Sequence, residues 1–259
     1  MKRILPLLVL ASMIAGQTFA QMEATAPNWQ VARFGIALGG DIDMPVNLDH
    51  HYLLRTAHDV GFDDSQLPFS HGEMTRMECD NGTFRIGISV SPLRKPNSEI
   101  LLSFLSIDGR IDMVHYEMGT EGNAEYQWLE VNAENKETAL EAVYLLRSQT
   151  GKRWNWYGGL GTNFGVSHTG KVHVKGFLLD NTITDDPAAG HEFDLTYNQR
   201  ESFNQRLFLQ AGVGIRFLRK MEFGLEFRKG LGYRASFGGP THMTILKRSL
   251  GFSLRCQLF

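Results

Sequence analysis

The chain has 259 residues and a formal net charge of -2, so it lacks the basic excess that nucleic-acid binding needs. Its mean hydropathy of -0.21 excludes a membrane protein built from apolar helices. The 27 glycines and the 11% aromatic content are typical of turn-rich all-β proteins. We therefore expect a fold made of strands and no nucleic-acid partner.

The first 20 residues have the three regions of a secretory signal peptide. Lys2 and Arg3 give a positive start, residues 4–14 form a short apolar stretch, and Ala20 ends a sequence with small residues at the cleavage positions. The apolar stretch is too short for a membrane-spanning helix. We expect a signal peptide over 1–20, cleaved on export, and a single domain over 21–259.

Alternation of apolar and polar residues, which indicates β-strands, recurs along the exported part of the chain. The predicted strands are residues 29–40, 83–90, 99–118, 125–147, 154–170, 193–217, 221–237 and 241–259. The third is expected to contain a bulge at 106–108, and the fourth is interrupted at 132–137. The fifth can continue through residue 178. The pattern favours eight strands, and ten remain possible if the fourth strand splits at its interruption.

The clearest alternation lies in residues 221–237. Apolar side chains occupy every second position from Met221 to Phe237, with Lys229 as the one polar member, while Glu222 and Glu226 lie on the opposite face with several glycines. Short connections at 93–98, 149–153 and 218–220 alternate with mostly longer ones, among them a long polar loop over 41–82. Short turns at one end and long loops at the other are typical of outer-membrane barrels, whose long loops are extracellular.

The glycines indicate which face of the barrel is inside. Eleven of them share the polar face of their strands: Gly35, Gly39, Gly87, Gly159, Gly161, Gly165, Gly212, Gly214, Gly224, Gly230 and Gly232. Glycine weakens a strand, and a water-exposed face would favour larger polar residues. A narrow interior, by contrast, needs small residues beside its charged side chains. We therefore predict that polar residues point inward and apolar residues meet lipid. A soluble, lipocalin-like binding barrel is the alternative.

The signal peptide, the alternating strands and the final Phe259 resemble the small outer-membrane β-barrels of Gram-negative bacteria, the OmpA-type or porin-family barrels. The resemblance covers the whole exported chain. It implies localisation in the outer membrane, contact with outer-membrane lipid and lipopolysaccharide, and recognition of Phe259 by the barrel-assembly machinery. Phe259 departs from the pattern, because the apolar register of the last strand ends on Leu258.

Two groups of residues are predicted to lie near the turn end of the barrel. An aromatic girdle at the membrane surface would consist of Trp29, Trp154, Trp156, Phe217 and Phe223. If Gly238 and Gly239 form a two-residue hairpin, paired residues of the last two strands have numbers that sum to 477, and Glu222 faces Arg255.

The short turn at 218–220 brings Arg216 beside Glu222 as well. We expect an Arg216–Glu222–Arg255 cluster inside the barrel, extended by Glu226, Arg228 and Arg206. Paired charges of this kind would fill an eight-strand interior as a plug, or line a narrow, gated pore.

The expected function is non-enzymatic, either structural and surface-interacting or that of a narrow pore. A lipid-modifying enzyme is the alternative, with rim residues Ser167, His168, His173, His242 and Thr244 as candidates. The acidic, histidine-rich residues of the first loop have no tight metal-ligand spacing. No metal and no cofactor are expected.

Overall fold

The computed structural model describes residues 29–45, 74–92, 95, 97–118, 126–148, 153–179, 190–237 and 242–258. These residues form nine strands: β1 (Trp29–Pro45), β2 (Met74–Pro92), β3 (Ser98–Met118), β4 (Tyr126–Arg147), β5 (Trp154–Leu179), β6 (Gly190–Asn198), β7 (Ser202–Leu218), β8 (Met221–Ser236) and β9 (His242–Gln257). No helix long and apolar enough to cross a membrane occurs in the part of the chain that the structure describes.

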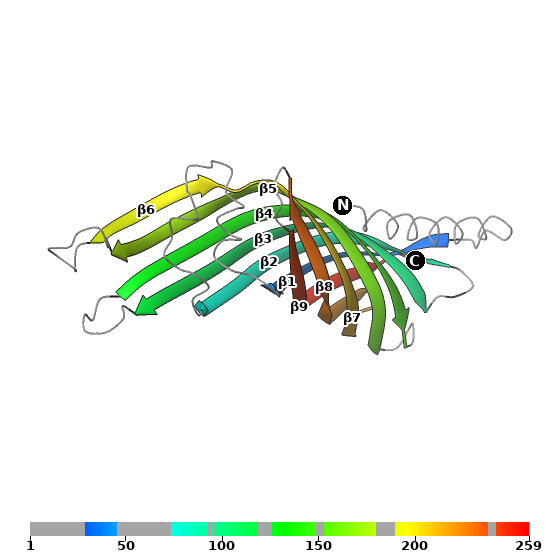
Figure 1. Cartoon of the computed structure of the whole chain (residues 1–259). Coiled ribbons are helices and arrows are strands. Elements are labelled where there is room, and N and C mark those ends of the chain that lie inside the picture. Colours follow the sequence, from blue (N-terminus) through cyan, green and yellow to red (C-terminus); the bar gives the residue numbers. More distant parts are fainter. Residues whose placement is uncertain are drawn as a thin grey trace.

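Eight of the nine described strands close into a ring (Figure 1). The order around it is β1–β2–β3–β4–β5–β7–β8–β9, every neighbouring pair is antiparallel, and β9 returns to β1. The long β5 pairs with β7 along its first part and with β6 along its last. Strands β6 and β7 are therefore two halves of the predicted sixth strand, parted at residues 199–201. The up-and-down barrel of eight strands is confirmed, and the ten-strand alternative is wrong.

Alternation gives the ring two chemically different surfaces. On β8, Phe223, Leu225 and Phe227 are between 43% and 49% exposed, whereas Glu222 and Glu226 are 4% and 2% exposed. Large apolar side chains are exposed on the other strands too, among them Leu38, Phe84, Phe104, Leu140, Leu160 and Leu209. A soluble binding barrel would bury its apolar face inside. An apolar outer wall around buried charges instead suits lipid, so the lipocalin-like alternative is wrong.

The pairing of the last two strands follows the predicted register. The residue numbers of every pair between β8 and β9 sum to 477, from Met221 with Cys256 to Ala235 with His242. Across the short turn at 219–220, Arg216 pairs with Glu222. The glycines of these strands therefore lie on the inner face and the aromatic and aliphatic residues on the outer face, as the alternation predicts.

Two predicted irregularities are wrong. Strands β3 and β4 pair without a register shift along their whole length, from Ser98 with Leu146 to Met118 with Tyr126. No bulge lies at 106–108, and β4 is not interrupted at 132–137. The alternation of β3 looked broken because its inner face is apolar as well, with Leu105 and Ile107 buried.

The irregularity lies instead in β5. Glu137 pairs with Ser167 and Lys136 pairs with Thr169, so His168 is an extra residue on the β5 side. Ser167 and the odd-numbered residues before it point inward, and after the bulge the even-numbered Val172 and Val174 point inward. A single inserted residue thus keeps one continuous inner surface while the sequence parity changes.

The long polar loop predicted over 41–82 is shorter than expected. Strand β1 continues to Pro45 and β2 begins at Met74, with Asp41 paired to Asn81. The polar residues at these strand ends still pair as β-strands, because strands that extend beyond the lipid-facing band need no apolar outer face. The signal peptide at 1–20, residues 46–73, the turn at 238–239 and Phe259 lie outside the described residues.

Strands β2 to β6 continue beyond the ends of β7, β8 and β9 as a curved sheet on one side of the barrel (Figure 1). We call the part of this sheet that β3, β4, β5 and β6 form, residues 109–118, 126–135, 170–179 and 190–198, the sheet extension. It lies at the loop end of the barrel, opposite the short turns that join β3 to β2 and β7 to β8. The bulge at His168 marks its base on β5.

Candidate functional site

The barrel interior holds a continuous chain of charged side chains, which we call the charge chain. Guanidinium groups and carboxylates alternate along it in the order Arg33, Glu99, Arg147, Glu222, Arg255, Glu226, Arg85, Glu141 and Arg228. All nine side chains are at most 8% exposed. They come from β1, β2, β3, β4, β8 and β9, so the charge chain ties together strands that are not neighbours in the ring.

The turn-end part of the charge chain is organised around Glu222. Its carboxylate lies 3.0 Å from Nη1 of Arg147 and 3.6 Å from Nη1 of Arg255, and Nδ2 of Asn155 donates to it at 2.8 Å. Arg216, predicted as a third member, is the backbone partner of Glu222, and its Nη2 donates to Gln257 at 3.5 Å. The alternation could not identify Arg147, because β4 and β8 are separated in the ring by β5 and β7.

The central part of the charge chain is organised around two carboxylates. Glu226 contacts Arg85 and Arg255 and accepts a hydrogen bond from Nε2 of Gln210 at 3.2 Å. Glu141 accepts from Arg228 at 2.7 and 3.0 Å and from Arg85 at 3.1 Å. Buried carboxylates and guanidiniums with several partners each are far less costly than isolated charges, because each desolvated group keeps its hydrogen bonds.

Two aromatic side chains fill the space that the charge chain leaves. The ring of Tyr157 lies between two guanidiniums, 4.9 Å from Arg147 and 4.5 Å from Arg255. A Cβ at Gly212 would lie 2.5 Å from Tyr157, and one at Gly161 would lie 2.6 Å from the Phe208 ring. The inward-facing glycines thus leave room for large side chains in a narrow interior, which is the role predicted for them from the sequence.

The interior is not uniformly polar, however. Leu101, Val143 and Leu145 pack with Tyr157 and Phe208 in one buried cluster, and Leu105, Ile107 and Ala139 form a second. These residues come mainly from β3 and β4. The rule that polar residues face inward therefore applies to the β7, β8, β9, β1 and β2 side, whereas the β3 and β4 side is largely apolar inside.

A separate charged group lies nearer the loop end. Arg206 donates to Glu137 through Nη1 at 2.5 Å and through Nη2 at 2.9 Å, and Nδ2 of Asn204 donates to Glu137 at 2.9 Å. Lys247 forms an ion pair with Asp41. Arg206, which was predicted to extend the cluster at Glu222, pairs with Glu137.

The five predicted girdle residues all point away from the barrel interior. Trp29, Trp154, Trp156, Phe217 and Phe223 are between 37% and 70% exposed, and each lies near the turn end of its strand. This position suits the interface between lipid headgroups and acyl chains, where aromatic rings are common.

The rim residues considered for catalysis are not brought together as a nucleophile and base. The Ser167 hydroxyl is buried and accepts from Asn204 and Arg234, both at 3.1 Å, whereas His168 is exposed on the other face. Nδ1 of His173 lies 2.9 Å from the Thr196 hydroxyl on the sheet extension. His242 and Thr244 lie on β9. Within the described residues, no group of three acidic, histidine or cysteine side chains could hold a metal ion.

The sheet extension reverses the polarity of the barrel wall. Its inner face is apolar and buried: Met113, Leu129, Val131, Ala133, Val172 and Val174 are all at most 3% exposed. Its outer face is charged, with Lys175 3.2 Å from Asp194 and Arg110 2.8 Å from Asp112. The hydrogen bond that Arg110 donates to the Asp112 carboxylate raises the pKa of the Arg110 guanidinium. Charge outside and apolar residues inside are the arrangement of a protein surface in water, so the reversal marks where the membrane ends.

A closed ring of eight antiparallel strands with an apolar outer wall and a charged interior defines a small membrane-spanning β-barrel of the outer-membrane type. No protein-family model matches the sequence, and no curated protein matches it. The chain is similar in structure to Neisserial surface protein A (10% identity, 89% of this chain and 99% of that one, TM-score 0.40).

Two further similar structures are Ail of Yersinia pestis in complex with the heparin analogue sucrose octasulfate, and OprG of Pseudomonas aeruginosa. For Ail the identity is 10%, the coverage 87% of this chain and 99% of that one, and the TM-score 0.33. For OprG the identity is 10%, the coverage 87% and 96%, and the TM-score 0.36. The class of protein rests on the closed ring and its apolar wall and not on these scores.

Proposed function

We propose that this protein is a non-conducting, non-enzymatic barrel of the Gram-negative outer membrane that presents the sheet extension at the cell surface. The observation that carries the proposal is the charge chain, which crosses the interior from β1 to β8 through direct contacts. With Tyr157 and Phe208 beside it, two cavities at its sides have volumes of only about 20 Å³ each. That is room for about one water molecule.

The lengths of the strands support a role at the surface. About 9–11 residues of a tilted strand cross a membrane, whereas β3, β4 and β5 have 21, 22 and 26 residues. The excess projects from the loop end, which faces outward in barrels of this type. A charged outer face on a rigid sheet, set to one side of the barrel, is suited to contact a large partner. The recognition of Phe259 by the assembly machinery remains part of the proposal.

The lipid partner is supported by two basic residues on the outer wall. Lys229 and Arg248 are exposed cross-strand partners on β8 and β9. They lie within the apolar band on its loop-end side, with Phe227 below and Leu231 above on β8. Like charges directly opposite one another destabilise a sheet. An anionic phosphate of an outer-leaflet lipid would relieve that repulsion.

The first test is conductance. The refolded protein, inserted in a planar bilayer after its gel mobility has been shown to shift on boiling, is expected to give no discrete current steps. The reason is that the ion pairs of Glu141 with Arg85 and Arg228 lie across the interior. Steady, repeated steps from verified folded protein would contradict the proposal and make the barrel a pore.

The second test concerns the lipid. Each basic residue near an anionic membrane surface contributes about 1 kcal/mol, so the double variant Lys229→Ala/Arg248→Ala should lose about 2 kcal/mol of unfolding free energy in phosphatidylglycerol vesicles. In phosphatidylcholine vesicles the loss should be much smaller. The matched control is Lys136→Ala/Lys171→Ala, two exposed lysines beyond the apolar band. An equal loss in both lipids would refute the phosphate contact.

A further inference from the structure

The charge chain carries an excess of one positive charge. It begins at Arg33 and ends at Arg228, so within the described residues it contains five guanidiniums and four carboxylates. Arginine stays protonated in proteins, so the excess cannot be removed by loss of a proton from a guanidinium. A buried net charge is costly unless a counter-charge lies close by.

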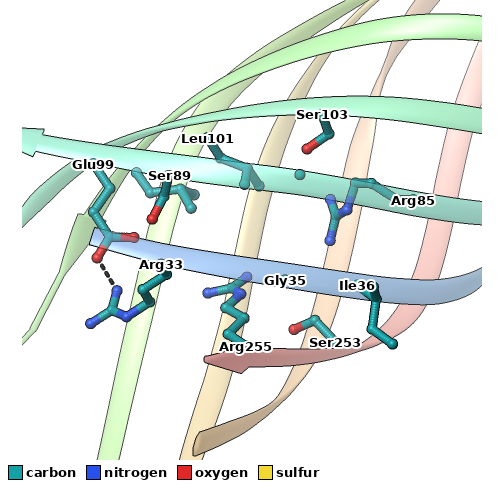
Figure 2. Close-up of a pocket in the computed structure, with 12 residues that line it drawn as sticks. Arg33, Gly35, Ile36, Arg85, Ser89, Glu99, Leu101, Ser103, Ser253 and Arg255 are labelled. Carbon is teal, nitrogen blue, oxygen red and sulfur yellow. Dashed lines mark hydrogen bonds and ion pairs between the residues drawn. The ribbon is translucent and has the colours of Figure 1, made fainter. Parts of the chain in front are cut away.

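A cavity lies beside the arginines of this chain, and Figure 2 shows the residues that line it. Arg33, Arg85 and Arg255 line this space from β1, β2 and β9, and the Arg33 guanidinium is turned toward Glu99 (Figure 2). Gly35 contributes no side chain there, which keeps the space open. The one carboxylate in the lining, Glu99, is already shared between Arg33 and Arg147.

Two hydroxyl groups in the cavity lining are also buried without a protein partner. Ser89 is 3% exposed and Ser103 is 7% exposed, and neither hydroxyl has a hydrogen-bond partner among the described residues. A buried hydroxyl that donates to nothing costs free energy. Three guanidiniums and two free hydroxyls make a lining that is rich in donors and poor in acceptors.

We propose that this cavity binds one small monovalent anion of the halide class, with chloride as the physiological member. Such an ion accepts hydrogen bonds from every side and donates none, which matches a donor-rich lining. It supplies the single negative charge that balances five guanidiniums against four carboxylates. The cavity volume of about 20 Å³ is enough for one monatomic ion. The site stabilises the interior and is independent of whether the barrel conducts or what the sheet extension binds.

Anomalous diffraction from crystals grown in bromide would locate the ion directly. The expected result is a bromide peak between Arg33, Arg85 and Arg255. Bromide elsewhere with none at this position would overturn the proposal.

Unfolding in urea gives the same test in solution. At constant ionic strength, replacing gluconate with chloride should raise the urea midpoint in a saturable way. The variant Ser89→Ala/Ser103→Ala should weaken the apparent chloride affinity about tenfold, because two donors are lost. Ser91→Ala is the matched control, since Ser91 is buried on the same strand and does not line the cavity.

A second variant, Arg33→Gln, removes the excess charge and should abolish the chloride dependence even if it lowers the midpoint overall. A midpoint that is the same in gluconate and chloride for the unmodified protein would overturn the proposal. So would a chloride effect that both variants leave unchanged, since that effect would arise from general salt screening.

Discussion

Glu226→Gln is expected to destabilise the folded barrel by about 3–5 kcal/mol, the cost of removing one partner from a buried ion pair. The Glu226 carboxylate contacts Arg85 and Arg255, lies 3.5 Å from Arg228, and accepts from Gln210. Glutamine has nearly the same shape, so the change isolates the loss of charge. Without the Glu226 carboxylate, the charge chain would hold five guanidiniums against three carboxylates in a buried interior.

The measurement is a urea titration of the refolded variant in vesicles, followed by the fraction of protein that keeps its folded gel mobility. Glu134→Gln serves as the matched control, because Glu134 is exposed on the sheet extension. We expect its unfolding midpoint to stay within error of the parent protein. Equal midpoints for both variants would mean that the charge chain contributes little to stability, and that shape alone fills the interior.

Gly230→Ala should also destabilise the barrel strongly, by about 1–3 kcal/mol and toward the upper end of that range. A Cβ at residue 230 would overlap the backbone oxygen of Leu207 and lie 2.6 Å from Cα of Phe208. Because both are backbone atoms of the neighbouring strand β7, no rotamer change can remove the clash. The two strands would have to separate locally, and Phe208 would lose part of its packing in the interior.

Gly82→Ala is the control for this second variant, since a Cβ there meets nothing within 4 Å. Alanine restricts the unfolded chain more than glycine does, so this control should be neutral or slightly stabilising. The same urea titration compares the two. If Gly230→Ala unfolds at the same midpoint as Gly82→Ala, then the close packing of β7 against β8 is not what limits the stability of the barrel.

Several features of the fold could be predicted because they depend on local pattern. A period of two identifies the strands and their two faces, and a two-residue hairpin fixes the register that pairs Glu222 with Arg255. The inward glycines identified which face is inside. These inferences need only neighbouring residues or neighbouring strands, so one sequence suffices for them.

The partners within the charge chain could not be predicted in the same way. Arg147 reaches Glu222, and Arg33 reaches Glu99, across the interior or between strands that do not adjoin. Which charges meet depends on the diameter of the ring and the length of each side chain, neither of which the alternation contains. The pairing of Arg206 with Glu137 could not be predicted for the same reason.

The sheet extension was missed for a different reason. The inserted His168 changes which positions of β5 point inward, so Val172 and Val174 fall on the opposite parity from Ser167. A single alternation rule across that point assigns them to the wrong face. The change from an apolar to a charged outer face, at Lys171 and Lys175, is the signal that could have located the membrane boundary.

The unbroken ladder between β3 and β4 has a mechanical consequence. Both strands pass from the sheet extension into the barrel without a hinge, and their pairing has no interruption from one end to the other. A partner that pulled on the sheet extension away from the membrane would load many of these hydrogen bonds at once, in shear, instead of peeling them apart one by one. The force would pass straight into the wall of the barrel, so the sheet extension would resist separation from the barrel.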